Sequence, residues 1–270
     1  MREGIKSVED TFCKHMMLYK GGIYYMDLYE QYKHNLHSFT IFSLFSGKLF
    51  IATTQVLFFS FKGYTFAQIM LVSSITEILL LILEVPSGVA ADLLGDKKCI
   101  LIGMSFIIAS NIQAVFSVNF LNAVTYAVLC ALGEAMISGA DQSFLYNTLS
   151  AVGKKEEFKE HIRKINSKKM YFVACVTILS GLLYKVNEYF PFLLTTIFYI
   201  MALIAVCNFK EIKDEKAKVD NITMHFKLVM LFLKESKNAI WIFFLGACYT
   251  YLFLNQNVLL QQYLMDVNFP

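Results

Sequence analysis

The sequence predicts an all-α, polytopic membrane protein, with a six-helix N-terminal bundle followed by the first helix of a second bundle. Hydrophobic residues make up 57% of the 270 positions and charged residues only 17%, whereas soluble domains carry about 25% charged residues. The apolar residues also gather into continuous blocks of about 20 residues, the length that crosses about 30 Å of hydrocarbon as a helix. A membrane barrel would instead show short segments of alternating polarity.

The apolar blocks predict seven membrane spans, at 38–60, 65–87, 99–118, 120–147, 169–187, 189–209 and 238–262. Alternating passage puts 21 of the 24 Lys and Arg residues on one side of the membrane, two on the other, and Lys48 inside the first span. Basic residues accumulate on the cytoplasmic side, so we expect a multi-pass cell-membrane protein with a cytoplasmic N-terminus. The weak fifth span is needed because, without it, the two most basic loops would lie on opposite sides.

Four segments follow from this topology. Residues 1–37 form a cytoplasmic N-terminal segment, 38–209 the six-helix bundle, 210–237 a cytoplasmic connector with an amphipathic helix, and 238–270 the first helix of an incomplete C-terminal bundle. The connector's apolar residues recur at helical spacing, which is typical of a helix lying on a membrane or on the bundle. Met26 shortly precedes the first span, so whether residues 1–25 are native stays open.

The composition gives no support to enzymatic chemistry. No Ser-His-Asp or Cys-His arrangement, phosphate-binding loop or metal-ligand cluster is recognisable, so we expect no enzyme activity, cofactor or metal. The six cysteines have no regular spacing and are expected to pack as small thiols between helices. Because membrane orientation already explains the basic loops, nucleic-acid binding is not predicted.

Two charged residues fall near the middle of consecutive predicted spans. A charge at the bilayer centre costs about 2.5–3.5 kcal/mol on insertion scales, so each charge needs a physical reason. Lys48 and Glu77 should lie at similar depth on antiparallel helices, and we expect them to form an ion pair. A role in binding substrate or ions is the second interpretation. The third is that Lys48 snorkels to the interface or that Glu77 is protonated.

A polar stripe marks the fourth predicted span. Glu134, Ser138 and Asp141 are spaced i, i+4 and i+7, so they share one face of a helix. Such a face meets protein or a water-filled cavity rather than lipid. In the seventh span, Asn255 and Gln256 either bind a solute or mark the outer interface.

The segment between the second and third spans carries a recognisable pattern. It runs Glu-Val-Pro-Ser-Gly and then Gly-x3-Asp-x2-Gly-x-Lys-Lys, with the motif residues Gly88, Asp92, Gly95, Lys97 and Lys98. This segment resembles the loop between helices two and three of the major facilitator superfamily. Residues 138–147 look like a segment of a bacterial efflux-type branch. Leu93 and Asp96 stand where the family usually has basic residues, so the gating contacts of this loop must be reduced or rerouted.

The resemblance implies two six-helix bundles of inverted repeats, with a substrate site between them near mid-membrane. Lys48, Glu134 and Asn255 then lie on cavity-lining helices. It implies secondary transport of a small molecule, drug-like compound or peptide, as a proton-coupled efflux antiporter. Glu77, Glu134 and Asp141 are the candidate proton carriers, because burial disfavours a charged carboxylate. At 270 residues the chain is then C-terminally truncated.

A non-transporting seven-helix membrane protein, such as a receptor or assembly factor, is the alternative function. This alternative takes the chain length as complete. It leaves unexplained the Gly-x3-Asp-x2-Gly-x-Lys-Lys motif of the hairpin between the second and third spans.

Overall fold

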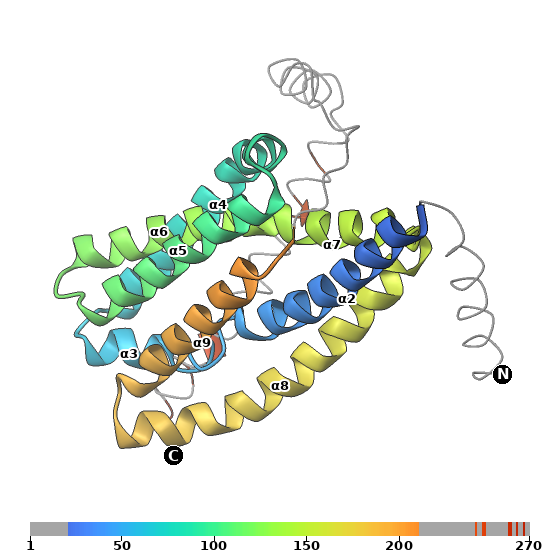
Figure 1. The fold of residues 1–270 in the computed structure, drawn as a ribbon. Coiled ribbons are helices and arrows are strands. Elements are labelled where there is room, and N and C mark those ends of the chain that lie inside the picture. The colour runs from blue at the N-terminus through green and yellow to red at the C-terminus, as the bar shows by residue number, and fades with distance from the viewer. Residues whose placement is uncertain are drawn as a thin grey trace.

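The computed structural model describes residues 21–210 and a few isolated positions between 241 and 267, and within them the regular structure is helical, without strands (Figure 1). The helices are α2 Gly21–Phe45, α3 Gln55–Phe61, α4 Phe66–Leu94, α5 Asp96–Val115, α6 Phe120–Ser138, α7 Ala140–Ala151, the short 3-10 helix η1 Lys155–Glu157, α8 Phe158–Val186 and α9 Phe190–Cys207. This confirms the all-α, polytopic membrane class. Whether the chain divides into the four predicted segments stays a prediction.

Within the described residues, five helical segments are long and apolar enough to cross a membrane. They are Phe66–Glu84, Asp96–Val115, Phe120–Ala151, Lys155–Val186 and Phe190–Cys207. They correspond to the second through sixth predicted spans, including the weak fifth. The stretch from residue 158 to 168, expected as a loop, instead forms the first turns of α8. The connector and the seventh span lie almost entirely outside the described residues.

The first predicted span differs from the structure. A continuous helix over 38–60 was expected, but α2 ends at Phe45 and α3 begins at Gln55. The intervening turns contain Ser46 and Gly47, and glycine weakens a helix interior because of its backbone entropy. The break is tied to α8: the Ser180 hydroxyl donates to the Phe50 carbonyl at 2.6 Å and accepts from the Thr53 hydroxyl at 3.1 Å.

The reversal after the second span occurs at a single residue. Helix α4 starts with a capping box, in which Thr65 and Gln68 exchange side-chain to backbone hydrogen bonds, and it continues through Pro86 to Leu94. Gly95 then adopts φ 88°, a conformation that glycine adopts without steric cost, and α5 begins at Asp96. Most of the predicted hairpin is therefore helix.

Helices α5 and α6 approach each other closely where two glycines meet. A Cβ added to Gly103 would lie 2.8 Å from the Gly133 carbonyl oxygen, and one added to Gly133 would lie 2.7 Å from the Gly103 carbonyl oxygen. Small residues permit this backbone approach between membrane helices. The crossing fixes α6, the helix that carries the predicted polar stripe, against the bundle.

The loops of the bundle gather at two ends. At one end, the Lys97 ammonium donates to the Cys207 and Phe209 carbonyls at 2.8 and 2.7 Å, and Asn35 bonds reciprocally to the Lys210 backbone. At the other end, the Lys62 ammonium donates to the Val115 carbonyl at 2.7 Å. Loops that the alternating topology assigned to the same side therefore do lie together.

Two aromatic clusters lie at opposite ends of α9. Phe144 stacks on Phe209 with ring centroids 4.2 Å apart, beyond the C-terminus of the helix. Phe58 stacks on Phe192 at 4.0 Å, near its N-terminus. Such aromatic pairs contribute about 0.5–1.5 kcal/mol beyond their buried area.

Candidate functional site

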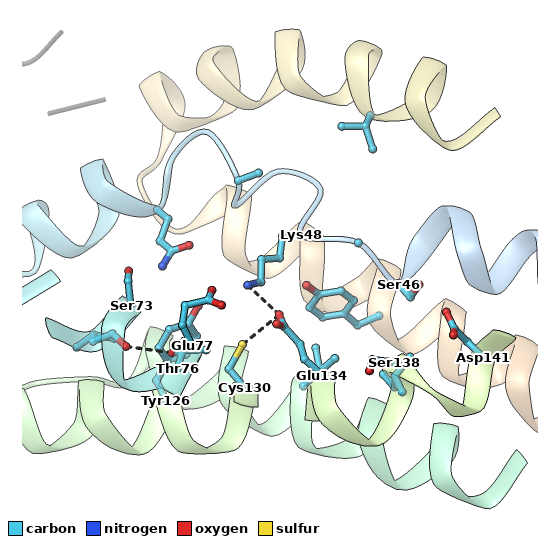
Figure 2. Close-up of a pocket in the computed structure, with 18 of the residues that line it drawn as sticks. Ser46, Lys48, Ser73, Thr76, Glu77, Tyr126, Cys130, Glu134, Ser138 and Asp141 are labelled. Carbon is cyan, nitrogen blue, oxygen red and sulfur yellow. Dashed lines mark hydrogen bonds and ion pairs between the residues drawn. The ribbon is translucent and has the colours of Figure 1, made fainter. Parts of the chain in front are cut away.

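A cavity of about 560 Å³, lined by both charged and apolar side chains, lies between the break after α2 and helices α3, α4, α5, α6, α7, α8 and α9 (Figure 2). Its lining comprises Ser46, Gly47, Lys48, Ala52, Gln55, Val72, Ser73, Thr76, Glu77, Ile107, Tyr126, Cys130, Glu134, Ile137, Ser138, Asp141, Lys169, Val173 and Tyr199. Ligand pockets for drug-sized molecules have volumes of about 300–1,000 Å³. The cavity is therefore large enough for a small organic molecule.

Lys48 and Glu134 form an ion pair across this cavity. The Lys48 Nζ lies 2.8 Å from the Glu134 Oε1, and the Cys130 thiol donates to the same oxygen at 3.5 Å. The side chains are 42% and 28% exposed, so the pair faces the cavity rather than close-packed protein. Since the break after α2 takes Lys48 out of a continuous helix, its side chain reaches α6.

The predicted pairing of Lys48 with Glu77 is therefore wrong. The prediction assumed that Lys48 and Glu77 lie at similar depth in the membrane on two continuous helices, but the first helix is broken at Lys48. Glu77 lines the same cavity from α4, and the structure shows no hydrogen bond or ion pair of its carboxylate among the described residues. Figure 2 places Ser73, Thr76 and Glu77 on one side of the Lys48–Glu134 pair.

Ser138 and Asp141 lie on the other side of the ion pair (Figure 2). The predicted stripe of Glu134, Ser138 and Asp141 lines one cavity, although α6 gives way to α7 at Gly139 between the last two. Lys169 joins them from α8, and electrostatic attraction links it to Asp141.

Several lining residues were not singled out from the sequence. Tyr126 and Cys130 extend the predicted stripe by two turns toward the N-terminus of α6, at i−8 and i−4 from Glu134. Helical spacing could have identified them. Lys169 and Tyr199 come from distant helices, and no local pattern marks them. Asn255 and Gln256 lie outside the described residues, so their predicted role stays a prediction.

The predicted gating residues lie at the end of α4 and the start of α5. Gly88, Asp92 and Lys98 are exposed, and a Cβ added to Gly88 would meet no described atom within 4 Å. Lys97 makes the contacts to the end of α9 described above.

Asp96, one of the departures from the family pattern, takes part in the same region. Its carboxylate accepts hydrogen bonds from the Ser143 hydroxyl at 3.1 Å and the Asn147 amide at 3.0 Å on α7. This contact joins the turn to the very segment, 138–147, that carries the second resemblance. A gating role of these residues stays a prediction.

A bundle of membrane-length helices around a cavity that holds an ion pair defines a polytopic membrane protein. Residues of this chain are 35% identical over 153 positions to an uncharacterised MFS-type transporter, YxaM, of Bacillus subtilis, covering 55% of this chain and 36% of that relative. No family model matches the chain. The match agrees with the resemblance stated from the Gly-x3-Asp-x2-Gly-x-Lys-Lys motif: part of this chain is similar to an MFS-type transporter, and the matched region spans about a third of that relative's length.

Proposed function

We propose that the chain forms part of a secondary active transporter that moves a small molecule across the cell membrane by alternating access. The Lys48–Glu134 pair inside the cavity carries this proposal. Ionisable side chains within a membrane are costly and mark substrate, ion or proton pathways. The relationship to an MFS-type transporter supports transport rather than an enzymatic reaction.

Alternating access needs contacts that close one end of the path and can be released. The contacts of Lys97 with the end of α9 and of Asp96 with α7 join three helices at one end of the cavity-bearing bundle. A ligand can shift the equilibrium between the closed and the open state only by the difference between its affinities for the two states. We therefore expect the open state to replace these contacts by others of similar free energy.

The proposed direction is efflux and the proposed coupling ion is the proton, which Glu134, Glu77 or Asp141 would carry. A deprotonated carboxylate in the cavity can form an ion pair with the Lys48 ammonium, whereas a protonated carboxyl group cannot. Proton binding could therefore break the contact with Lys48. In inside-out membrane vesicles the cytoplasmic face of the protein, where we expect its N-terminus, points outward. An exported substrate is therefore taken up into such vesicles.

Uptake by such vesicles tests transport. Vesicles containing the protein are given a cytosolic small-molecule extract and an imposed proton gradient, and their contents are measured by mass spectrometry. We expect at least one compound to accumulate, and its accumulation to fall to the protein-free level when the gradient is collapsed. Accumulation that is unchanged when the proton gradient is collapsed would reject proton coupling. If no compound accumulates in a protein-dependent way, the result would favour a non-transporting protein.

The Glu134→Gln variant tests the proton carrier. The amide cannot take up or release a proton, so gradient-driven uptake should be lost while gradient-free exchange of the same compound continues. Glu160→Gln is the matched control, because Glu160 is an exposed carboxylate at the start of α8, outside the cavity. Undiminished gradient-driven uptake by the Glu134 variant would assign the proton to another residue.

A further inference from the structure

The charges that line the cavity do not balance. Three carboxylates, Glu77, Glu134 and Asp141, face two ammonium groups, Lys48 and Lys169. Glu134 is paired with Lys48 at 2.8 Å, and Asp141 lies within electrostatic reach of Lys169. Glu77 also lies within electrostatic reach of Lys48, but that ammonium is paired with Glu134, so among the described residues that line the cavity Glu77 is the carboxylate without an ammonium group of its own.

The uncharged neighbours of Glu77 add hydrogen-bond acceptors. Thr76 donates its hydroxyl hydrogen to the Val72 carbonyl at 3.0 Å, which leaves its oxygen lone pairs as acceptors. Ser73 lies one helical turn before Glu77, and Gln55 lines the same cavity from the start of α3. Hydroxyl and amide oxygens beside a carboxylate match a ligand that brings several N–H donors together with a positive charge.

The remaining walls are aromatic and aliphatic. Tyr126 and Tyr199 are 5% and 3% exposed and line the cavity from α6 and α9. Tyrosine rings attract cations through their electron-rich faces. Ile107, Ile137 and Val173 complete an apolar surface that would cover the uncharged body of a ligand.

We propose that the cavity binds a small organic molecule with a protonated primary or secondary amine, which pairs with Glu77, and with an apolar or aromatic body that packs on the tyrosines. This inference rests on the proposed transport function and names its substrate class. A quaternary ammonium lacks N–H donors and would leave the acceptors around Glu77 unused. A carboxylate ligand would add a negative charge to a cavity whose ammonium groups already have acidic neighbours.

Three probes with one aromatic body test the charge preference: 1-naphthylmethylamine, 1-naphthylmethanol and 1-naphthoate. Their binding to the full chain, purified in detergent, is measured at pH 7 by equilibrium dialysis. We expect the amine to bind about 10- to 100-fold more tightly than the alcohol, the range of a charge-assisted hydrogen bond, and the naphthoate to bind weakest. Equal binding of amine and alcohol, or tighter binding of naphthoate, would overturn the proposal.

The Glu77→Gln variant locates the site. It should bind the amine no better than the alcohol, while its affinity for the alcohol stays within about twofold of the unmodified chain, a difference of about 0.4 kcal/mol. Retained alcohol binding shows that the cavity is still folded. Glu84→Gln removes the same charge from the same helix two turns later, at an exposed position outside the cavity, and should keep the full preference. Loss of the preference in both variants would overturn the assignment to Glu77.

The vesicle assay separates this inference from the proposed function. Transport of an anionic or neutral compound, together with weak amine binding, would reject the amine class and leave transport standing. Tight amine binding that depends on Glu77, with no uptake of any compound, would reject transport and leave the binding site standing.

Discussion

At the scale of single residues, the Lys48–Glu134 pair has the largest consequence. Removing one partner of a fully buried pair costs about 3–5 kcal/mol, because the other charge is left without compensation. Here 42% of Lys48 and 28% of Glu134 remain exposed to the cavity, so water can reach the remaining charge. The cost should therefore be smaller than for a sealed pair and larger than for a surface pair.

A double-mutant cycle measures this coupling. We expect Lys48→Met and Glu134→Gln each to lower the free energy of unfolding by about 1–3 kcal/mol, and the charge swap Lys48→Glu with Glu134→Lys to recover most of it. The measurement is denaturant unfolding in detergent. The exposed pair Lys164–Glu160, whose atoms lie 2.6 Å apart on α8, is the control and should contribute under about 1 kcal/mol. A charge swap no more stable than the single variants would contradict the pairing.

At the scale of elements, the crossing of α5 and α6 depends on the absence of side chains at Gly103 and Gly133. An added methyl group at either position would lie under 3.0 Å from a backbone carbonyl oxygen. Forcing extra volume into such a contact costs about 1–3 kcal/mol. The separation of the two helices sets the position of the cavity-lining stripe on α6, so the effect should extend to ligand binding.

The matched pair Gly133→Ala and Gly181→Ala tests this crossing. Gly133→Ala should lower the thermal unfolding midpoint, whereas Gly181→Ala should leave it unchanged or raise it, since a Cβ at Gly181 meets nothing within 4 Å. Alanine stabilises an ordinary helical position by about 0.5–1 kcal/mol relative to glycine. Equal effects of the two substitutions, measured by thermal unfolding in detergent, would show that the helices can separate without cost.

At the scale of the whole molecule, the positions of the five spans found in the described residues could be predicted from the sequence, because apolar blocks are local patterns. The stripe of Glu134, Ser138 and Asp141 could also be predicted, since helical spacing alone places it on one face. The partner of Lys48 could not. It depends on the break at Ser46–Thr54, and that break depends on contacts with Ser180, more than 120 residues away along the chain.

The same break has a consequence for the synthesis of the chain. Glu134 follows Lys48 by 86 positions, which corresponds to about 4–17 s at about 5–20 residues per second. Until then the first segment carries an uncompensated ammonium, whose insertion costs about 2.5–3.5 kcal/mol. We expect nascent chains that end before α6 to leave residues 38–60 open to protease added from the cytoplasmic side, and chains that expose all of α6 outside the ribosome to protect them. Equal digestion of both chains would contradict this order. In that order of events, the fourth membrane segment completes the insertion of the first.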